Sequence, residues 1–183
     1  MRKLKLQVQM TVDGFIAGPN GEMDWVSMNW DDQLKNYVGD LTTPVDCIVL
    51  GRKLAEGFIP YWAANPEQDG ADIFNGSHKV VFTKTLEKSD WENTVLAKGD
   101  IVEEITKLKE QDGGDIIAYG GAHFVSALIK NGLIDEYHLF FNPAAIGEGL
   151  PIFKELNSKK DLTLVKSNAF DCGIVVMHYE SKK

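Results

Sequence analysis

At residues 115–123 the chain runs Asp115-Ile116-Ile117-Ala118-Tyr119-Gly120-Gly121-Ala122-His123. The apolar residues up to Tyr119 predict a strand. Apolar side chains at helical spacing between Ala122 and Lys130 predict a helix. A glycine pair between strand and helix exposes backbone N–H groups beside the positive helix end, where a pyrophosphate can bind. A tight strand–helix turn would require the same glycines, so both interpretations stay open.

The same alternation of strands and helices extends outward in both directions. We predict further strands at 4–10, 45–50, 79–82, 94–97, 134–142, 162–170 and 174–179. Helices are expected at 31–41, 54–58 and 100–111, whereas 60–76 is expected to be irregular, with a short helix near Asp72. This order predicts an α/β fold with a mixed, mostly parallel central sheet, helices on both faces and a C-terminal antiparallel hairpin. We expect a single domain over residues 1–183.

The first strand and the loop after it have distinct patterns. In residues 4–10 apolar side chains alternate with Lys5, Gln7 and Gln9, which predicts a strand with one face in the core. Residues 14–28 contain three glycines and are expected to form a long ordered loop. Such loops in compact domains often carry function.

Composition narrows the classes of partner and location. The net charge of −8 argues against nucleic acid or an anionic membrane as the main partner and leaves a small-molecule ligand. No apolar stretch approaches the roughly 18 residues that a membrane span needs. The two cysteines, Cys47 and Cys172, are expected to be free packing residues in a reducing compartment, so we expect a cytoplasmic protein. No CxxC pair and no partner spacing among the four histidines is seen, so no metal site is expected.

Two further strand ends carry groups suited to phosphate. Gly51-Arg52-Lys53 follows the strand at 45–50 and offers a close backbone approach and two cations. Thr83-Lys84-Thr85 follows the strand at 79–82 and suits a ribose 2′-phosphate, which favours NADP over NAD. Parallel strands would bring both ends to the same sheet edge as Gly120 and Gly121, where open α/β sheets bind ligands. His123 is the one histidine placed to contact phosphate.

The early loop supplies the candidate acids. Asp13 and Asp31 could orient a heterocycle or relay a proton, and Asp24 and Asp32 are also near. Helix capping and turn formation are the structural alternative for each of these carboxylates.

Four segments together give the chain a family resemblance. They are Thr11–Ala17, Val49–Arg52, Tyr119–Ala122, and Leu133–Tyr137 followed by Pro143–Phe153. In order and spacing the chain resembles the dihydrofolate-reductase-like superfamily. Within it, the chain is most similar to single-domain bacterial proteins like the C-terminal reductase domain of RibD, a bifunctional riboflavin-biosynthesis enzyme.

The resemblance implies a three-layer dihydrofolate-reductase-like fold and an NADPH-dependent reductase. Its substrate would be pterin-like or ribosylaminopyrimidine-like, as for a 5-amino-6-(5-phosphoribosylamino)uracil reductase. A homodimer is also expected, and the resemblance implies that Asp135-Glu136 and the 147–153 loop shape the last strands and a dimer face. The implied cofactor contacts are Ile16, Ala17, Gly51, Arg52, Lys53, Thr83, Lys84, Thr85, Gly120, Gly121, Ala122, His123 and Phe124.

At two positions the chain differs from these reductases. Leu54 stands where they often carry a phosphate-binding threonine. Trp25 matches a loop tryptophan near the substrate, and Asp31 is the candidate for the acid that holds the pterin ring. A dihydrofolate reductase, a nucleotide-binding module without catalysis, and a flavin- or sugar-phosphate-binding protein remain alternatives.

Overall fold

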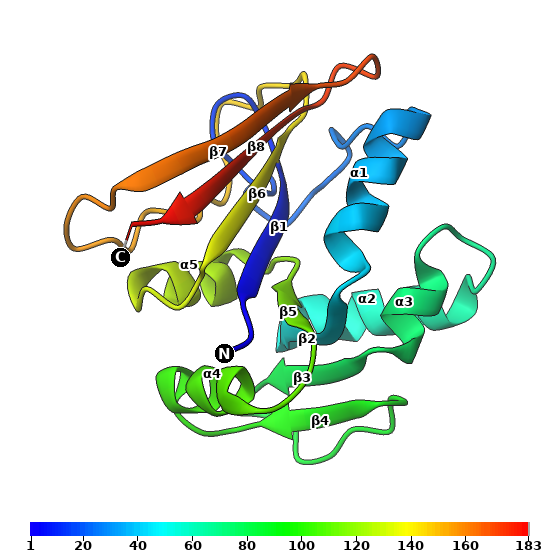
Figure 1. Ribbon diagram of the computed structural model, residues 1–183, viewed down its shortest axis with the longest axis vertical. Helices are drawn as coiled ribbons and strands as arrows, with labels where there is room; N and C mark the ends of the chain where they lie inside the picture. Colours follow the sequence, from blue (N-terminus) through cyan, green and yellow to red (C-terminus); the bar gives the residue numbers. More distant parts are fainter. Residues whose placement is uncertain (183) are drawn as a thin grey trace.

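The computed structural model describes residues 1–182, which contain one eight-stranded sheet in the order β4-β3-β2-β5-β1-β6-β8-β7 (Figure 1). The strands are β1 (Leu4–Met10), β2 (Val45–Gly51), β3 (His78–Phe82), β4 (Thr94–Ala97), β5 (Asp115–Ala118), β6 (Glu136–Phe141), β7 (Leu162–Ala169) and β8 (Val175–Ser181). The helices are α1 (Asp32–Thr42), α2 (Arg52–Ala64), α3 (Ala71–Gly76), α4 (Ile101–Glu110) and α5 (Ala122–Lys130).

Strand direction confirms the mixed α/β sheet. All neighbouring pairs among β1 to β6 are parallel, whereas β8 runs antiparallel to both β6 and β7. The closing hairpin turns at Asp171–Gly173, where Gly173 has a φ of +89°. The carboxyl ends of the six parallel strands therefore lie along one edge of the sheet.

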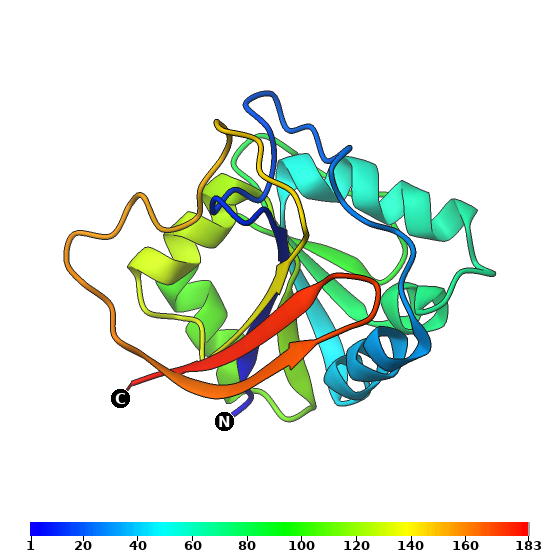
Figure 2. The ribbon, with the colours of Figure 1, turned by 90° about the horizontal axis from the view of Figure 1, so that it is seen from above.

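Helices cover both faces of the sheet, as the view in Figure 2 makes plain. On one face α4 and α5 pack Ile105, Val125 and Leu128 against the even-numbered residues of β1. On the other face α1, α2 and α3 contribute Leu34, Ile59 and Phe74 to a second apolar cluster. Three layers result, because each helix buries one apolar stripe against the sheet.

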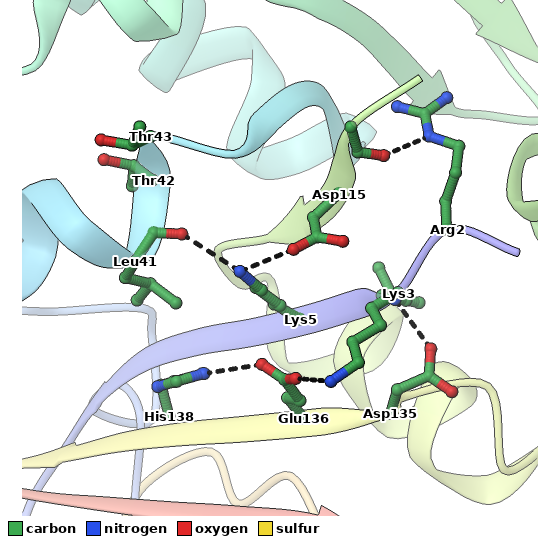
Figure 3. Close-up of polar contacts among 12 residues, drawn as sticks. Arg2, Lys3, Lys5, Leu41, Thr42, Thr43, Asp115, Asp135, Glu136 and His138 are labelled. Carbon is green, nitrogen blue, oxygen red and sulfur yellow. Dashed lines mark hydrogen bonds and ion pairs between the residues drawn. The ribbon is translucent and has the colours of Figure 1, made fainter. Parts of the chain in front are cut away.

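The prediction that β1 has only one buried face is wrong. Lys5 and Gln7 are 6% and 7% exposed, although the alternation suggested that they face water. The central position of β1 buries both faces, and Lys5 is accommodated by contacts with Asp115 Oδ2 at 2.8 Å and the Leu41 carbonyl at 3.4 Å (Figure 3). A buried charge is tolerated when it is paired in this way.

The second helix also differs from expectation. The short helix predicted at 54–58 extends through Pro60 to Ala64, into a segment expected to be irregular. Ala55 and Ile59 are buried, and Phe58 and Trp62 pack against Phe74, so tertiary packing outweighs the helix-breaking tendency of the proline.

In the part of the chain that the structure describes, no helix combines the length and apolarity needed to cross a membrane.

Candidate functional site

Three glycine- or threonine-bearing strand ends meet along the carboxyl edge of the sheet, as predicted. β2 lies between β3 and β5, with Gly51 opposite Phe82 and Val49 opposite Ala118. The turns after these strands therefore follow one another along the same edge. This is the position where ligands of open α/β sheets bind.

Two helices begin side by side at this edge. The backbones at the starts of α2 and α5 approach so closely that a Cβ at Gly51 would lie 2.8 Å from Phe124 Cβ. Neither N-cap, Gly51 or Gly121, offers a side-chain hydrogen bond, and neither first turn contains an acidic residue. Unpaired N–H groups and two positive helix ends therefore converge on one small region.

The geometry of the glycine pair bears on the two roles considered from the sequence, a phosphate-binding backbone and a tight strand–helix turn. Gly120 and Gly121 have φ values of +147° and +74°, which L side chains rarely adopt. An added Cβ would nevertheless meet nothing closer than Leu54, at 3.6 Å from Gly120 and 3.9 Å from Gly121. The positive φ values explain both glycines as parts of a tight strand–helix turn, and phosphate binding by this backbone stays a prediction.

The cationic and hydroxyl side chains expected to bind phosphate differ in exposure and in hydrogen bonding. Arg52 Nη1 donates to Glu56 Oε1 at 2.8 Å, while Lys53, Lys84 and His123 are exposed. The buried Thr83 hydroxyl oxygen accepts from Thr85 N and Leu86 N and so shapes its own turn. Lys84 and Thr85 remain at the surface beside that turn.

The early loop is anchored to the loop that follows β6. Ile16 and Ala17, both buried, exchange backbone hydrogen bonds with Leu150 at 3.0 and 2.8 Å. A Cβ on Gly149 would lie 2.3 Å from the Ala17 carbonyl oxygen, so glycine is needed for this close approach. The anchored loop borders a hollow of about 230 Å³ lined by Gly18, Pro19, Glu22, Asp24, Trp25, Ile146 and Glu148.

Trp25, one of the residues that line this hollow, has a buried donor without a partner. Its indole N–H is buried and has no hydrogen-bond partner. Buried polar atoms are nearly always paired, so this unpaired donor is unusual for a folded protein.

The two carboxylates considered as catalytic groups bind backbone N–H groups. Asp13 accepts from Gly147 N at 2.7 Å and Ile146 N at 3.1 Å. Hydrogen bonds from the Thr11 hydroxyl and Gly147 lower the pKa of Asp13. The geometry favours an anchoring role for Asp13, and a catalytic role remains a prediction.

Asp31 has a similar environment. It caps α1 by accepting from Leu34 N at 2.8 Å, and its other oxygen accepts from Cys172 N at 3.0 Å. These backbone hydrogen bonds lower the pKa of the Asp31 carboxyl. Capping was one of the two roles considered for this residue, and substrate binding by Asp31 remains a prediction.

Sequence reasoning missed several buried polar residues. Asn142 is fully buried and ties the early loop to the sheet through Ser27 N at 2.9 Å and Gln9 Oε1 at 2.8 Å. His138 and His178, which showed no partner spacing in the sequence, lie directly opposite each other on β6 and β8. A polar residue ending an apolar run could have indicated Asn142, whereas the histidine pair depends on strand register.

Comparison with known proteins agrees with this geometry. The family described as the RibD C-terminal domain matches residues 2–176. The uncharacterized protein YyaP of Bacillus subtilis strain 168 is 32% identical over 182 residues, covering 97% of this chain and 94% of its own length.

Solved structures share the fold. A Thermotoga maritima diaminohydroxyphosphoribosylaminopyrimidine deaminase/5-amino-6-(5-phosphoribosylamino)uracil reductase matches 99% of this chain and 57% of its own, at 18% identity and a TM-score of 0.73. A dihydrofolate reductase from Enterococcus faecalis complexed with NADP(H) matches 99% and 97% of the two chains, at 19% identity and a TM-score of 0.66. With the fold and the whole-length match in agreement, the chain belongs to the family of the RibD C-terminal domain.

Proposed function

We propose that this protein is an NADPH-dependent reductase that transfers a hydride to a pterin-like or ribosylaminopyrimidine-like substrate. The observation that carries the proposal is the pair of adjoining, uncapped helix starts at Gly51 and Gly121. Membership of a reductase-domain family supports the same cofactor and reaction class.

In this proposal the cofactor supplies the hydride and the protein aligns the two reactants. The N–H groups around Gly120 and Gly121, with Arg52 and Lys53, would hold the pyrophosphate. Lys84 and Thr85 would contact the ribose phosphate end. The loop at Ile16 and Ala17 would meet the nicotinamide, and the hollow beside Trp25 would take the substrate.

The first test is a fluorescence titration with NADPH. Gly121→Asp places a carboxylate at the helix start, so we expect NADPH affinity to fall at least tenfold, equivalent to about 1.4 kcal/mol. Gly132→Asp is the matched control, because Gly132 also has a positive φ, of +67°, with no atom within 4 Å of an added Cβ, but follows the other end of α5. Absence of binding by the wild type, or unchanged affinity in Gly121→Asp, would refute the cofactor assignment.

A second candidate is a nucleotide-binding protein without catalysis. It is favoured by the engagement of both Asp13 and Asp31 with backbone N–H groups, which leaves neither carboxylate unbonded. NADPH oxidation with a panel of pterins and ribosylaminopyrimidines separates the candidates. Turnover supports the reductase, and tight binding without turnover of any panel member supports the second candidate.

A further inference from the structure

Three metal-ligating side chains gather on one face of the sheet, beneath α1. Glu136 and His138 are two residues apart on β6 and so share a face. His178 is the register partner of His138 on the antiparallel strand β8 and lies on the same face. Figure 3 shows the β6 pair with Glu136 directed between His138 and Lys3.

The distances among these groups are short. Glu136 Oε2 lies 3.4 Å from His138 Nε2 and 3.8 Å from His178 Nε2, and one ligand atom from each residue falls within 4.8 Å of the others. The imidazole rings are stacked with centroids 4.2 Å apart. Zinc bonds of about 2.0–2.2 Å would place tetrahedral ligand atoms about 3.3 Å apart, so the three ligand atoms must move closer together and the stacked rings must turn to bind one ion.

Two buried polar atoms in this region lack partners. His178 Nε2 is buried without a hydrogen bond, and so is Oε1 of Gln7, the register partner of His138 on β1. Buried polar atoms are rarely left unpaired, and each such case needs an explanation such as a water or an ion. Glu136 and His138 are only 7% and 4% exposed, so bulk water does not supply their hydrogen-bond partners.

Neighbouring groups orient the candidate ligands. The Tyr37 hydroxyl lies 2.7 Å from His138 Nδ1, which leaves Nε2 facing Glu136. Lys3 pairs with the other carboxylate oxygen, Oε1, and with Glu180 at 3.7 Å, so Oε2 is the oxygen that faces the two histidines.

We propose that Glu136, His138 and His178 bind a divalent transition-metal ion, with zinc as the ion that suits the donors best. Two imidazoles and one carboxylate form a borderline donor set, which prefers zinc or cobalt to magnesium or calcium. Three protein ligands leave a fourth position for water or for Gln7. The bound ion would join β6 to β8 and so hold the C-terminal hairpin to the parallel part of the sheet. This proposal is independent of the NADPH site.

The first experiment follows all four histidines of the wild-type protein by NMR during titration of the metal-free full chain with zinc chloride. We expect the ring signals of His138 and His178 to shift and those of the exposed His78 and His123 to stay unchanged. Unchanged His138 and His178 signals at millimolar zinc would overturn the proposal and indicate a water-filled polar pocket. Shifts confined to His78 or His123 would also overturn it.

The second experiment measures zinc affinity by calorimetry in three proteins. His178→Asn should weaken binding at least tenfold and should abolish the rise in melting temperature that zinc causes in the wild type. His78→Asn, which changes an exposed histidine on β3, should bind zinc within twofold of the wild type. Equal affinity in His178→Asn and the wild type would overturn the proposal. If His178→Asn does not fold, the wild-type NMR titration decides.

Discussion

Asp31 joins two segments that are far apart in the sequence. One carboxylate oxygen caps α1 at Leu34 N, and the other accepts from Cys172 N in the hairpin turn between β7 and β8. At the scale of single residues, this carboxylate therefore links the helix over one sheet face to the C-terminal hairpin.

We predict that Asp31 contributes pH-dependent stability. Its folded pKa is below the ordinary 3.8, so the contribution is present above that value and is lost as the pH falls through the folded pKa. Asp31→Asn should therefore melt below the wild type at pH 7, with a gap that narrows below about pH 4. Thermal unfolding from pH 7 to pH 2.5 checks this.

The control for this prediction is Asp32→Asn, which changes the neighbouring residue in the first turn of α1. A gap between wild type and Asp31→Asn that is independent of pH would contradict the anchoring role. A large loss of turnover in Asp31→Asn with an unchanged melting temperature would instead support the catalytic role.

A second residue-scale prediction concerns the two free cysteines. Cys47 is only 1% exposed, and this burial raises the pKa of its thiol to about 11. Because the thiolate is the reactive form, we expect iodoacetamide at pH 8 to modify half-buried Cys172 first and to reach Cys47 only after unfolding. Peptide mass spectrometry measures both sites, with the urea-unfolded protein as control. Equal modification of both thiols in the native protein would contradict the burial of Cys47.

At the scale of elements, α2 carries an internal proline. Pro60 has no N–H to donate to the Glu56 carbonyl, and its side chain is exposed. We predict that Pro60→Ala stabilises the protein by about 1 kcal/mol, because a helix hydrogen bond is regained and part of the gain is offset by a more flexible unfolded chain. Chemical denaturation measures the change.

Pro66→Ala is the matched control for α2. Pro66 is exposed and follows the helix, so its replacement should only loosen the unfolded chain and leave stability equal or slightly lower. A stability in Pro60→Ala at or below that of the wild type would show that the proline is favourable where it stands.

At the scale of the whole molecule, β7 is an edge strand with apolar side chains on its surface. Leu164 and Val165 are 51% and 50% exposed, and β7 pairs only with β8 among the described residues. Unpaired backbone groups beside exposed apolar side chains form a surface suited to a second copy of the chain.

We therefore predict a homodimer that uses β7. Val165→Lys should shift the protein toward monomer by at least tenfold in the dissociation constant, as measured by analytical ultracentrifugation. Val102→Lys on α4 is the control, since Val102 is 39% exposed but lies away from this edge. A monomeric wild type at 100 µM, or a dimer unaffected by Val165→Lys, would contradict the prediction.

The elements were largely predictable from local sequence. Asp100 caps α4 as its position indicated, and the strands at 45–50 and 94–97 appear close to their predicted bounds. Capping residues, glycine turns and apolar periodicity act over a few residues, so they are visible in the sequence alone. Pro60 shows the limit, because Phe58 and Trp62 pack against Phe74 of another helix and so support α2 beyond its predicted end.

The placement of the strand ends along one edge of the sheet was predictable for a similar reason. Once the strands are parallel, their carboxyl ends must share one edge, and glycines at Gly51 and Gly121 mark the turns there. The roles of Asp13 and Asp31 could not be separated in advance, because their backbone partners at Gly147 and Cys172 are more than 130 residues away.

The alternating α/β order, the glycine-led helix starts and the family resemblance could all be found in the amino-acid sequence, because each depends on short-range patterns. Which polar residues are buried together became clear only once the chain was seen folded. The burial of Lys5 depends on helices covering both faces of β1, and the approach of His138 to His178 depends on the register between β6 and β8. Register and layer packing are set by the sum of many distant contacts, so no local pattern contains them.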